Sequence, residues 1–246
     1  MQPQQQTPFR FGEIINLTSL GLDPQFFKFN VTHLESERYI AIRDQDQNGA
    51  PQLTVVELFN KFNLVRRPGG KIEGSIMHLK DNIVALKAGL EGGKGHMLQI
   101  FNMEKKEKLN NLEFPDNIVF WRWVAEDMLA VVTTAAVYHV SIARSNEKEV
   151  KIFDRSGDLK EGQIIGYCLG PDRKWSALFG ISTPDGGKTI NGHIQLYFIE
   201  GGKQQLLEGH ACTFGKVKVH NETHASNLFC FVERKAGETK SLVHVT

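Results

Sequence analysis

Four short motifs in this chain bring together residue types that hold phosphates, metals or nucleophiles in other proteins. The first, residues 182–189 (STPDGGKT), differs by one letter from a phosphate-binding P-loop, because Ser182 stands at the first glycine position. A P-loop holds its phosphate at the N-terminus of the helix that follows it. The residues on both sides are typical of strands, so the sequence predicts a hairpin turn here.

The second motif, residues 44–49 (DQDQNG), begins like a calcium-binding loop, with Asp44, Asp46 and Asn48 at alternate positions. The twelfth position of such a loop is a bidentate glutamate, and here it is Val55. Asp, Asn and Gly also form turns between strands. A turn is therefore predicted, and a calcium-dependent binder is kept as the lesser alternative.

The other two motifs contain cysteine and histidine. Residues 166–170 (GYCLG) resemble a nucleophile elbow around Cys168, but that elbow needs a helix after its strand, and no helical pattern follows. His220 and His224 are four residues apart, a spacing that joins two metal ligands only on a helix, and their segment has the composition of a loop. We therefore predict no catalytic residues, no metal site and no cofactor, and we expect that the protein is not an enzyme.

Composition limits the class of protein. Of the 246 residues, 41% are hydrophobic and 23% are charged, which is ordinary for a globular protein with a sizeable core. The net charge of +1 gives no general attraction to nucleic acid, so no such partner is expected. No apolar run reaches the ~18 residues of a membrane-spanning helix. Because the N-terminus lacks a signal-peptide core and the three cysteines, Cys168, Cys212 and Cys230, suit buried thiols in a reducing compartment, we expect a cytoplasmic protein.

The elements that must position any site are strands. Helical periodicity is nearly absent, and short apolar or alternating runs are separated by Gly, Asn, Asp and Pro. The predicted strands span 39–43, 53–58, 83–88, 98–103, 128–133, 137–142, 164–169, 176–181, 194–199, 228–233 and 242–245. Five hairpins recur at a period of about 47 residues, each with room for two more strands, which is the size of a propeller blade. We therefore expect an all-β fold, a β-propeller with about five blades.

Adjacent propeller blades leave a groove that can hold an extended peptide. Residues 64–68 (LVRRP) lie between one predicted hairpin and the next, whose outer strand starts near Met97 and is followed by lysines. Since side chains alternate along a strand, Met97, Gln99 and Phe101 share one face. Apolar residues beside exposed lysines suit an apolar and acidic peptide. Lysines after a strand also prevent edge pairing, so a plain solvated hairpin stays open as the other interpretation.

Many short segments of the chain resemble one known family. They are 65–68 (VRRP), 83–89 (IVALKAG), 98–102 (LQIFN), 120–123 (FWRW), 136–139 (AVYH), 153–155 (FDR), 163–165 (QII), 195–197 (QLY), 208–211 (EGHA) and 228–231 (LFCF). In this order they closely resemble the clathrin heavy chain N-terminal (terminal) domain. The resemblance covers essentially all 246 residues.

The resemblance implies a seven-bladed β-propeller at the tip of a clathrin leg, on the cytoplasmic face of coated pits and coated vesicles. Such a domain is not an enzyme and needs no cofactor. It recruits adaptor and accessory proteins through short linear peptides, and it contacts the membrane only through those adaptors. Clathrin light chains and other heavy chains would be bound only through the leg. The alternative is another cytoplasmic propeller scaffold that binds proteins through its top face.

Three peptide sites follow from the resemblance. In the first, the groove for the apolar-acidic "clathrin box" peptide, apolar residues and Phe101 would take the apolar side chains, Gln99 the peptide backbone, and Arg67 with the lysines the carboxylates. This groove maps onto Val65, Arg67, Val84, Met97, Gln99, Phe101, Lys106 and Lys108. A second pocket near the propeller axis maps onto Phe29, Gln163, Ile165 and Ile181. A third groove, between the fourth and fifth blades, maps onto Trp175 and Leu196, with a less firm alignment over 201–205.

The sequence departs from the family pattern in three places. Met97 stands where the family has a small polar residue, and Gly69 where it has an aliphatic one. The hairpin loop 90–96 is longer than in the family. The chain, a single domain over 1–246, ends after about five repeats, so we expect an incomplete ring that exposes two sheet faces and tends to associate.

Overall fold

The structure of this chain, a computed structural model, describes residues 11–59, 61–218, 224–235 and 237–246. Nineteen strands in these ranges form five antiparallel sheets, and the helical elements there are three short 3-10 helices: η1 (Leu17–Leu20), η2 (Pro24–Phe26) and η3 (Gly157–Leu159). Within the same ranges, no helix combines the length and apolar character needed to cross a membrane. The predicted all-β class is confirmed.

Each sheet is a meander of strands that are consecutive in the chain, and we number the sheets as blades 1 to 5. Blade 1 contains β1 (Thr32–His33), β2 (Tyr39–Gln45), β3 (Pro51–Glu57) and β4 (Leu64–Pro68). Blade 2 contains β5 (Ile72–Met77), β6 (Ile83–Gly89), β7 (His96–Asn102) and β8 (Glu107–Phe114). Blade 3 contains β9 (Ile118–Ala125), β10 (Met128–Thr133), β11 (Ala136–Ser141) and β12 (Val150–Asp154). Blade 4 contains β13 (Gln163–Leu169), β14 (Trp175–Ser182), β15 (Asn191–Phe198) and β16 (Lys203–Glu208), and blade 5 contains β17 (Ala211–Val217), β18 (Ser226–Glu233) and β19 (Leu242–Val245).

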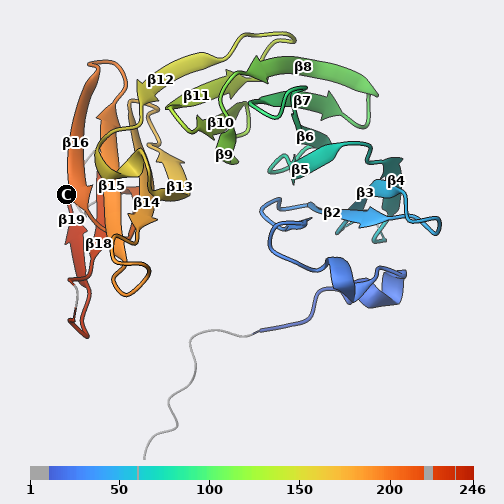
Figure 1. Cartoon of the computed structure of the whole chain (residues 1–246), viewed down its shortest axis with the longest axis horizontal. Coiled ribbons are helices and arrows are strands. Elements are labelled where there is room, and N and C mark those ends of the chain that lie inside the picture. Colours follow the sequence, from blue (N-terminus) through green and yellow to red (C-terminus); the bar gives the residue numbers. More distant parts are fainter. Residues whose placement is uncertain (1–10, 60, 219–223, 236) are drawn as a thin grey trace, which may run out of the picture.

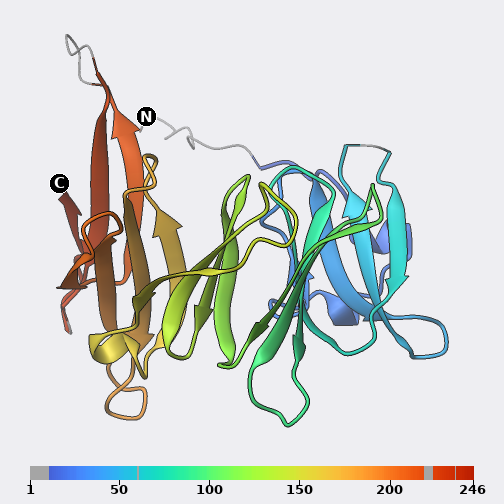
Figure 2. The ribbon, with the colours of Figure 1, turned by 90° about the horizontal axis from the view of Figure 1, so that it is seen from above.

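The blades follow one another around an arc, from blue at blade 1 to red at blade 5 (Figure 1). Seen from above, neighbouring sheets stand side by side with their faces opposed (Figure 2). Four-stranded meanders arranged in this way are the architecture of a β-propeller. The predicted fold and its five blades are therefore confirmed.

The five predicted hairpins are all present, as the pairs β2–β3, β6–β7, β10–β11, β14–β15 and β18–β19. The two further strands expected in each unit occur in blades 1 to 4, and the described part of blade 5 has one of them. Pattern alone did not locate most of these inner and outer strands, because several are polar or only half-buried.

The hydrophobic core is divided among the spaces between neighbouring blades. In the space between blades 2 and 3, Leu98 and Ile100 of β7 meet Leu129 and Val131 of β10, all fully buried. Burying one such side chain contributes roughly 1.5–3 kcal/mol. Each blade therefore depends on its neighbours for stability, and the faces that meet decide which side chains remain available for binding.

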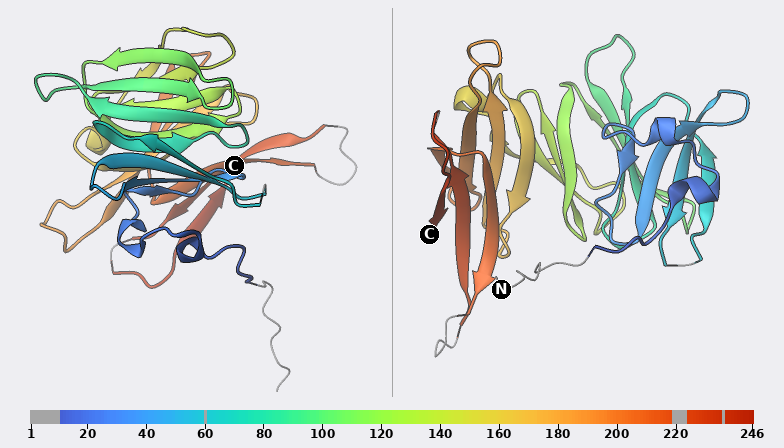
Figure 3. Two further views of the ribbon diagram at one scale, coloured as in Figure 1. Left: turned by 90° about the vertical axis from the view of Figure 1, so that its right-hand side faces the viewer. Right: turned by 90° about the horizontal axis from the view of Figure 1, so that it is seen from below.

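The two ends of the arc differ. The outer face of blade 1 packs against the N-terminal segment, where Leu22 and neighbouring apolar residues cover Ile40 and Ile42. Figure 3 shows this segment with its short helices beside blade 1. The expectation that an open ring exposes two sheet faces is therefore wrong for blade 1, because a local segment covers that face.

Blade 5 does present an apolar face to solvent. Phe229 and Phe231 of β18 pack toward blade 4, and Cys230 between them points the other way. Val245, opposite Cys230 in the ladder, is 60% exposed, and Val243 is 67% exposed. The three cysteines are only partly buried, so the expectation that they are buried hydrophobic residues is too strong.

Candidate functional site

Strand β7 presents different side chains to its two neighbouring blades. Leu98 and Ile100 are fully buried in the core against blade 3. Phe101 packs instead with the cluster between blades 1 and 2, and Met97 and Gln99 lie on the same side of the strand. The alternation predicted for this segment is confirmed, and the half-buried face belongs to the space between blades 1 and 2.

A cavity of about 570 Å³ opens in that space. Its lining is mainly apolar and comes from both blades: Leu53, Arg67, Pro68, Ile72, Val84, Leu86, Phe101, Met103 and Lys106. Four of the eight residues predicted for the first site line this cavity, namely Arg67, Val84, Phe101 and Lys106. Val84 is only 2% exposed, so it forms the floor and offers little surface to a ligand.

The other four predicted residues continue the same surface beyond the cavity. Val65 lies next to Arg67 along β4, at alternate positions on one face. Lys108 stands opposite Phe101 in the β7–β8 ladder. The Gln99 amide nitrogen donates to Asn111 Oδ1 at 2.9 Å and contacts Met97 Sδ at 3.5 Å. The structure thus places these side chains around the cavity without enclosing them in it.

Five lining residues were missed by sequence reasoning. Leu86 could have been found, because it follows Val84 by two positions on β6 and so shares its face. Leu53 stands opposite Arg67 in the β3–β4 ladder, which only the register reveals. Met103, just beyond the end of β7, has no strand periodicity to mark it, and its place in the cavity follows from the turn.

Three cations border this groove. Lys106 has a left-handed backbone, with φ at 53°, in a turn held by Asn102, whose Oδ1 accepts from the backbone amides of Glu104 and Lys105. Arg67 donates through Nη1 to the carbonyl of Arg66 at 3.1 Å. Over the described ranges, neither Arg67, Lys106 nor Lys108 is held in an ion pair with a carboxylate of the chain. Their charges are therefore available to a ligand.

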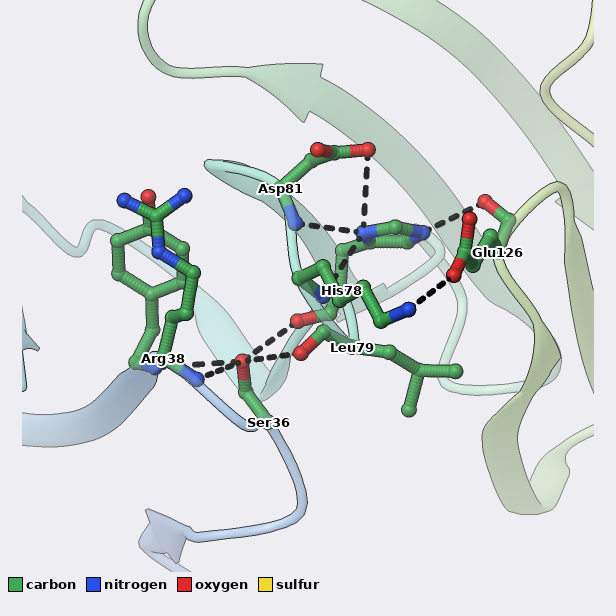
Figure 4. Close-up of polar contacts among 8 residues, drawn as sticks. Ser36, Arg38, His78, Leu79, Asp81 and Glu126 are labelled. Carbon is green, nitrogen blue, oxygen red and sulfur yellow. Dashed lines mark hydrogen bonds and ion pairs between the residues drawn. The ribbon is translucent and has the colours of Figure 1, made fainter.

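A buried histidine fixes the blades that form the groove. The His78 ring, fully buried, accepts at Nδ1 from the amide of Asp81 at 2.9 Å and donates from Nε2 to the Glu126 carbonyl at 2.6 Å. The Ser36 hydroxyl donates to the His78 carbonyl at 2.7 Å (Figure 4). Because Nδ1 accepts, the proton of the neutral ring is on Nε2. Through its ring and its backbone carbonyl, this one residue thus links blades 1, 2 and 3.

The second predicted pocket is less complete. Gln163 and Ile181 are partners in the β13–β14 ladder, and the bulge between Ile164 and Gly166 leaves Ile165 40% exposed. Phe29, before β1, is fully exposed, so the described chain does not enclose it in a pocket. This pocket stays a prediction.

The third predicted groove has its two residues on one face. Trp175 and Leu196 both lie on the side of blade 4 that meets blade 5, where Leu196 packs in the core. Trp175 is 38% exposed as a residue, and its ring centroid lies 4.8 Å from that of Phe198. The arrangement offers an exposed aromatic surface, and its use in binding stays a prediction.

Three of the four motifs form structural elements. Residues 44–49 make the turn between β2 and β3, where Asp46 Oδ1 accepts from the amides of Asn48 and Ala50 at 2.8 and 2.9 Å. Residues 182–189 lie at the end of β14 and in the loop before β15, and 166–170 lie in β13 and just after it. Of the two histidines, His220 lies outside the described residues. Within the described residues, no group of three or more His, Cys, Asp or Glu could hold a metal ion.

One arrangement resembles a catalytic triad. Ser182 Oγ is 2.7 Å from His193 Nε2, and His193 Nδ1 is 3.4 Å from Asp158 Oδ2. A nucleophile must face the site where its substrate binds. The neighbouring cavity of about 320 Å³ is lined by His193 and Asp158 but not by Ser182. These contacts tie the hairpin of blade 4 to η3.

Comparison with known proteins gives consistent relatives. No family model matches the chain. It is 36% identical over 242 residues to clathrin heavy chain 2 of Oryza sativa subsp. japonica, covering 97% of this chain and 14% of that protein. It is 35% identical over 244 residues to clathrin heavy chain 1 of Arabidopsis thaliana, again 97% and 14%. With clathrin heavy chain 2 of Homo sapiens it shares 34% identity over 227 residues, 92% of this chain and 13% of that protein.

The chain therefore spans about one seventh of the length of these relatives. Among solved structures, the β-propeller domain of the Trilobed protease from Pyrococcus furiosus matches with a TM-score of 0.46 and 11% identity, over 86% of this chain and 69% of that chain. At this score the likeness carries no argument about function.

Proposed function

This chain belongs to the clathrin heavy chain family, and from that premise we propose that it binds short apolar-acidic peptides in the groove between blades 1 and 2. The observation that carries the proposal is the cavity of about 570 Å³, whose apolar wall has Arg67 and Lys106 at its edge. An extended peptide could place apolar side chains in the cavity and carboxylates against the cations.

The energetics assign different roles to the two kinds of contact. Exposed ion pairs typically contribute about 0.2–1 kcal/mol each, whereas burying an apolar side chain contributes roughly 1.5–3 kcal/mol. The cavity lined by Leu86, Phe101 and Met103 would therefore supply most of the affinity. The cations Arg67, Lys106 and Lys108 would steer the peptide and set its register.

The same premise extends to the cellular role. As a terminal domain of the clathrin type, the chain would recruit adaptor and accessory proteins to a vesicle coat on the cytoplasmic side of the membrane, as a structural component with no catalytic activity. Contact with the membrane would be indirect, through adaptors. Binding of light chains and other heavy chains would belong to parts of the relatives that this chain does not span. The 1–246 chain would act as one propeller domain, and the two further sites, around Ile165 and around Trp175, would take other peptides.

The test is a fluorescence-polarisation titration with a labelled peptide carrying a clathrin box. The variant Arg67→Glu/Lys106→Glu/Lys108→Glu should weaken binding at least tenfold, because three attractions become repulsions. A matched control, Arg66→Glu/Lys105→Glu, changes two nearby cations that do not line the cavity, and should bind within about twofold of the parent.

Equal affinity of the triple variant and the parent would reject this groove as the site. A peptide that fails to compete with the protein's natural partner would favour the alternative, a propeller scaffold that binds through its top face. Circular dichroism spectra of both variants should match the parent, which excludes misfolding as the cause of lost binding.

A further inference from the structure

The outer strand of blade 2, β8, has a positive charge at one end of its groove face and a negative charge at the other. In β8, Asn110, Leu112 and Phe114 are buried toward blade 3. The alternate residues Asn111 and Glu113 are exposed and point the other way. The hydrogen bond from Gln99 to Asn111 confirms that this face is continuous with the groove face of β7.

The ladder between β7 and β8 fixes the order of the charges. Lys108 stands opposite Phe101, at the end where the cavity lies, and Glu113 stands opposite Met97, at the other end. The same face thus runs from a cation through the amide of Asn111 to an anion. Within the described ranges, Glu113 is in no ion pair with the chain, so its charge is as available as that of Lys108.

The two charges are far enough apart to act separately. A register shift in the ladder between Ile100 and Phe101 puts Lys108 on the same face as Glu113. Their partners Phe101 and Met97 are four positions apart on β7, or about 13 Å at a rise of roughly 3.3 Å per residue. The Debye length at 0.1 M salt is about 10 Å, so the field of the lysines is largely screened at the glutamate. A peptide extended along the strand has a similar rise and would reach both ends with about four residues.

We propose that this groove prefers peptides of mixed charge, with an acidic residue next to an apolar one at the cavity end and a basic residue about four positions away beside Glu113. The inference rests on the proposed peptide-binding function and adds a requirement to it. A peptide that is acidic along its whole length meets attraction at Lys106 and Lys108 and repulsion at Glu113. The partner is thus a segment in which an acidic-apolar core is followed or preceded by Lys or Arg.

The experiment compares labelled peptides that share one apolar-acidic core. Each has, about four positions from the acidic residue, a Lys, a Gln or a Glu, placed on the N-terminal side in one series and on the C-terminal side in the other. Only the series whose chain direction brings the variable residue beside Glu113 should respond. In that series, the parent should bind the Lys peptide about two- to fivefold more tightly than the Gln peptide, as expected for one exposed ion pair. The Glu peptide should bind more weakly than the Gln peptide, and 0.5 M NaCl should remove these differences.

Variants assign the effect to Glu113. Glu113→Lys should reverse the order of the Lys and Glu peptides, and Glu113→Gln should abolish the preference. The control Glu107→Lys changes an acidic residue of the same strand that stands opposite Asn102, and should leave the order unchanged.

The outcomes separate the two proposals. If no peptide binds the folded parent, the proposed function fails. If all peptides bind with equal affinity, or if Glu113→Lys leaves the order unchanged, peptide binding stands and the mixed-charge preference is overturned.

Discussion

Blades 2 and 4 carry the same pair of polar and aromatic residues on their third strands, but the glutamine is half-buried in blade 2 and fully buried in blade 4. In blade 2 the pair is Gln99 and Phe101, beside an open cavity. In blade 4 the pair is Gln195 and Tyr197, on the face toward blade 3, where Phe153, Tyr197 and Gln204 line a cavity of about 480 Å³. Tyr197 stacks on Phe153 of β12, with ring centroids 4.6 Å apart.

The two glutamines differ in the same way. Gln195 is fully buried, and its Nε2 donates to the Asp154 carbonyl at 2.9 Å and to Gln204 at 2.8 Å. Its Oε1 accepts from the amide of Ser156 at 3.1 Å. Gln99, only half-buried, bonds within its own blade. The comparison teaches that both spaces between blades hold a surface cavity, but the preceding blade binds Gln195 through the Asp154 carbonyl and the Ser156 amide, whereas no such partner takes Gln99 away from the groove face in the described ranges.

The largest effect should come from Arg155, which links blade 3 to the segment that leads into blade 4. Its guanidinium, 4% exposed, donates to the carbonyls of Leu159, Thr133, Thr134 and Gly162. Arg155→Met should lower the free energy of unfolding by about 3–5 kcal/mol, because buried carbonyls lose their donors. Urea denaturation measures the change.

The matched control is Arg67→Met in the open groove, which should change stability by no more than about 0.5 kcal/mol. Similar losses for both variants would contradict the division between a structural space and a binding space.

Acid should give the next largest loss in the free energy of unfolding, through His139 between blades 3 and 4. Burial lowers the pKa of His139, whose Nε2 contacts the Tyr167 hydroxyl at 2.7 Å, from 6.5 to about 4. The unfolded chain therefore binds a proton between these values that the folded chain does not, so stability is full above pH 6.5 and is lost as the pH falls toward 4. The loss attributable to this group is roughly 3 kcal/mol.

Unfolding free energies measured from pH 7 to pH 4 would show this slope. His139→Gln should flatten it, since the variant has no group to protonate at that position. An unchanged slope in the variant would assign the acid sensitivity to other groups, such as His33, whose pKa is also lowered by burial.

The glutamine pair gives a smaller and more direct contrast. Gln195→Leu should cost about 1–3 kcal/mol of stability, because the amide of Ser156 and the carbonyl of Asp154 lose their buried partner. Gln99→Leu should change stability by less than about 0.5 kcal/mol and weaken peptide binding instead. Thermal unfolding and fluorescence polarisation on both variants test this contrast. A larger loss of stability in Gln99→Leu than in Gln195→Leu would contradict it.

The smallest effect concerns the groove alone. Met97→Thr removes a flexible side chain that contacts Gln99, and should leave stability within about 0.5 kcal/mol. Its affinities for box peptides with bulky and with small apolar residues should shift relative to each other by a few-fold. Fluorescence-polarisation titration with the two peptide sets measures this shift. If the ratio of the two affinities is the same in the variant and in the parent, Met97 is not a source of specificity.

Much of the fold follows from local pattern. The two-residue alternation of Leu98 and Ile100 against Phe101 predicts which face of β7 is buried, and the repeated hairpins predict the blades. The outer strand β4 could not be identified in this way, because it contains Arg66, Arg67 and a proline and owes its place to the ladder with β3. Resemblance to relatives supplied the site residues, and the structure gathered half of the first set around one cavity.

The sequence by itself determined the strand periodicity, the blade repeat and the family to which the chain belongs. Each of these depends on residues close in the chain or on their order. Only the tertiary structure decided that Gln99 is half-buried beside a groove and that Gln195 is fully buried. The physical reason is that the partners of Gln195, the Asp154 carbonyl and the Ser156 amide, come from the end of the preceding blade and the segment after it, so its burial depends on how two sheets pack and not on either segment alone.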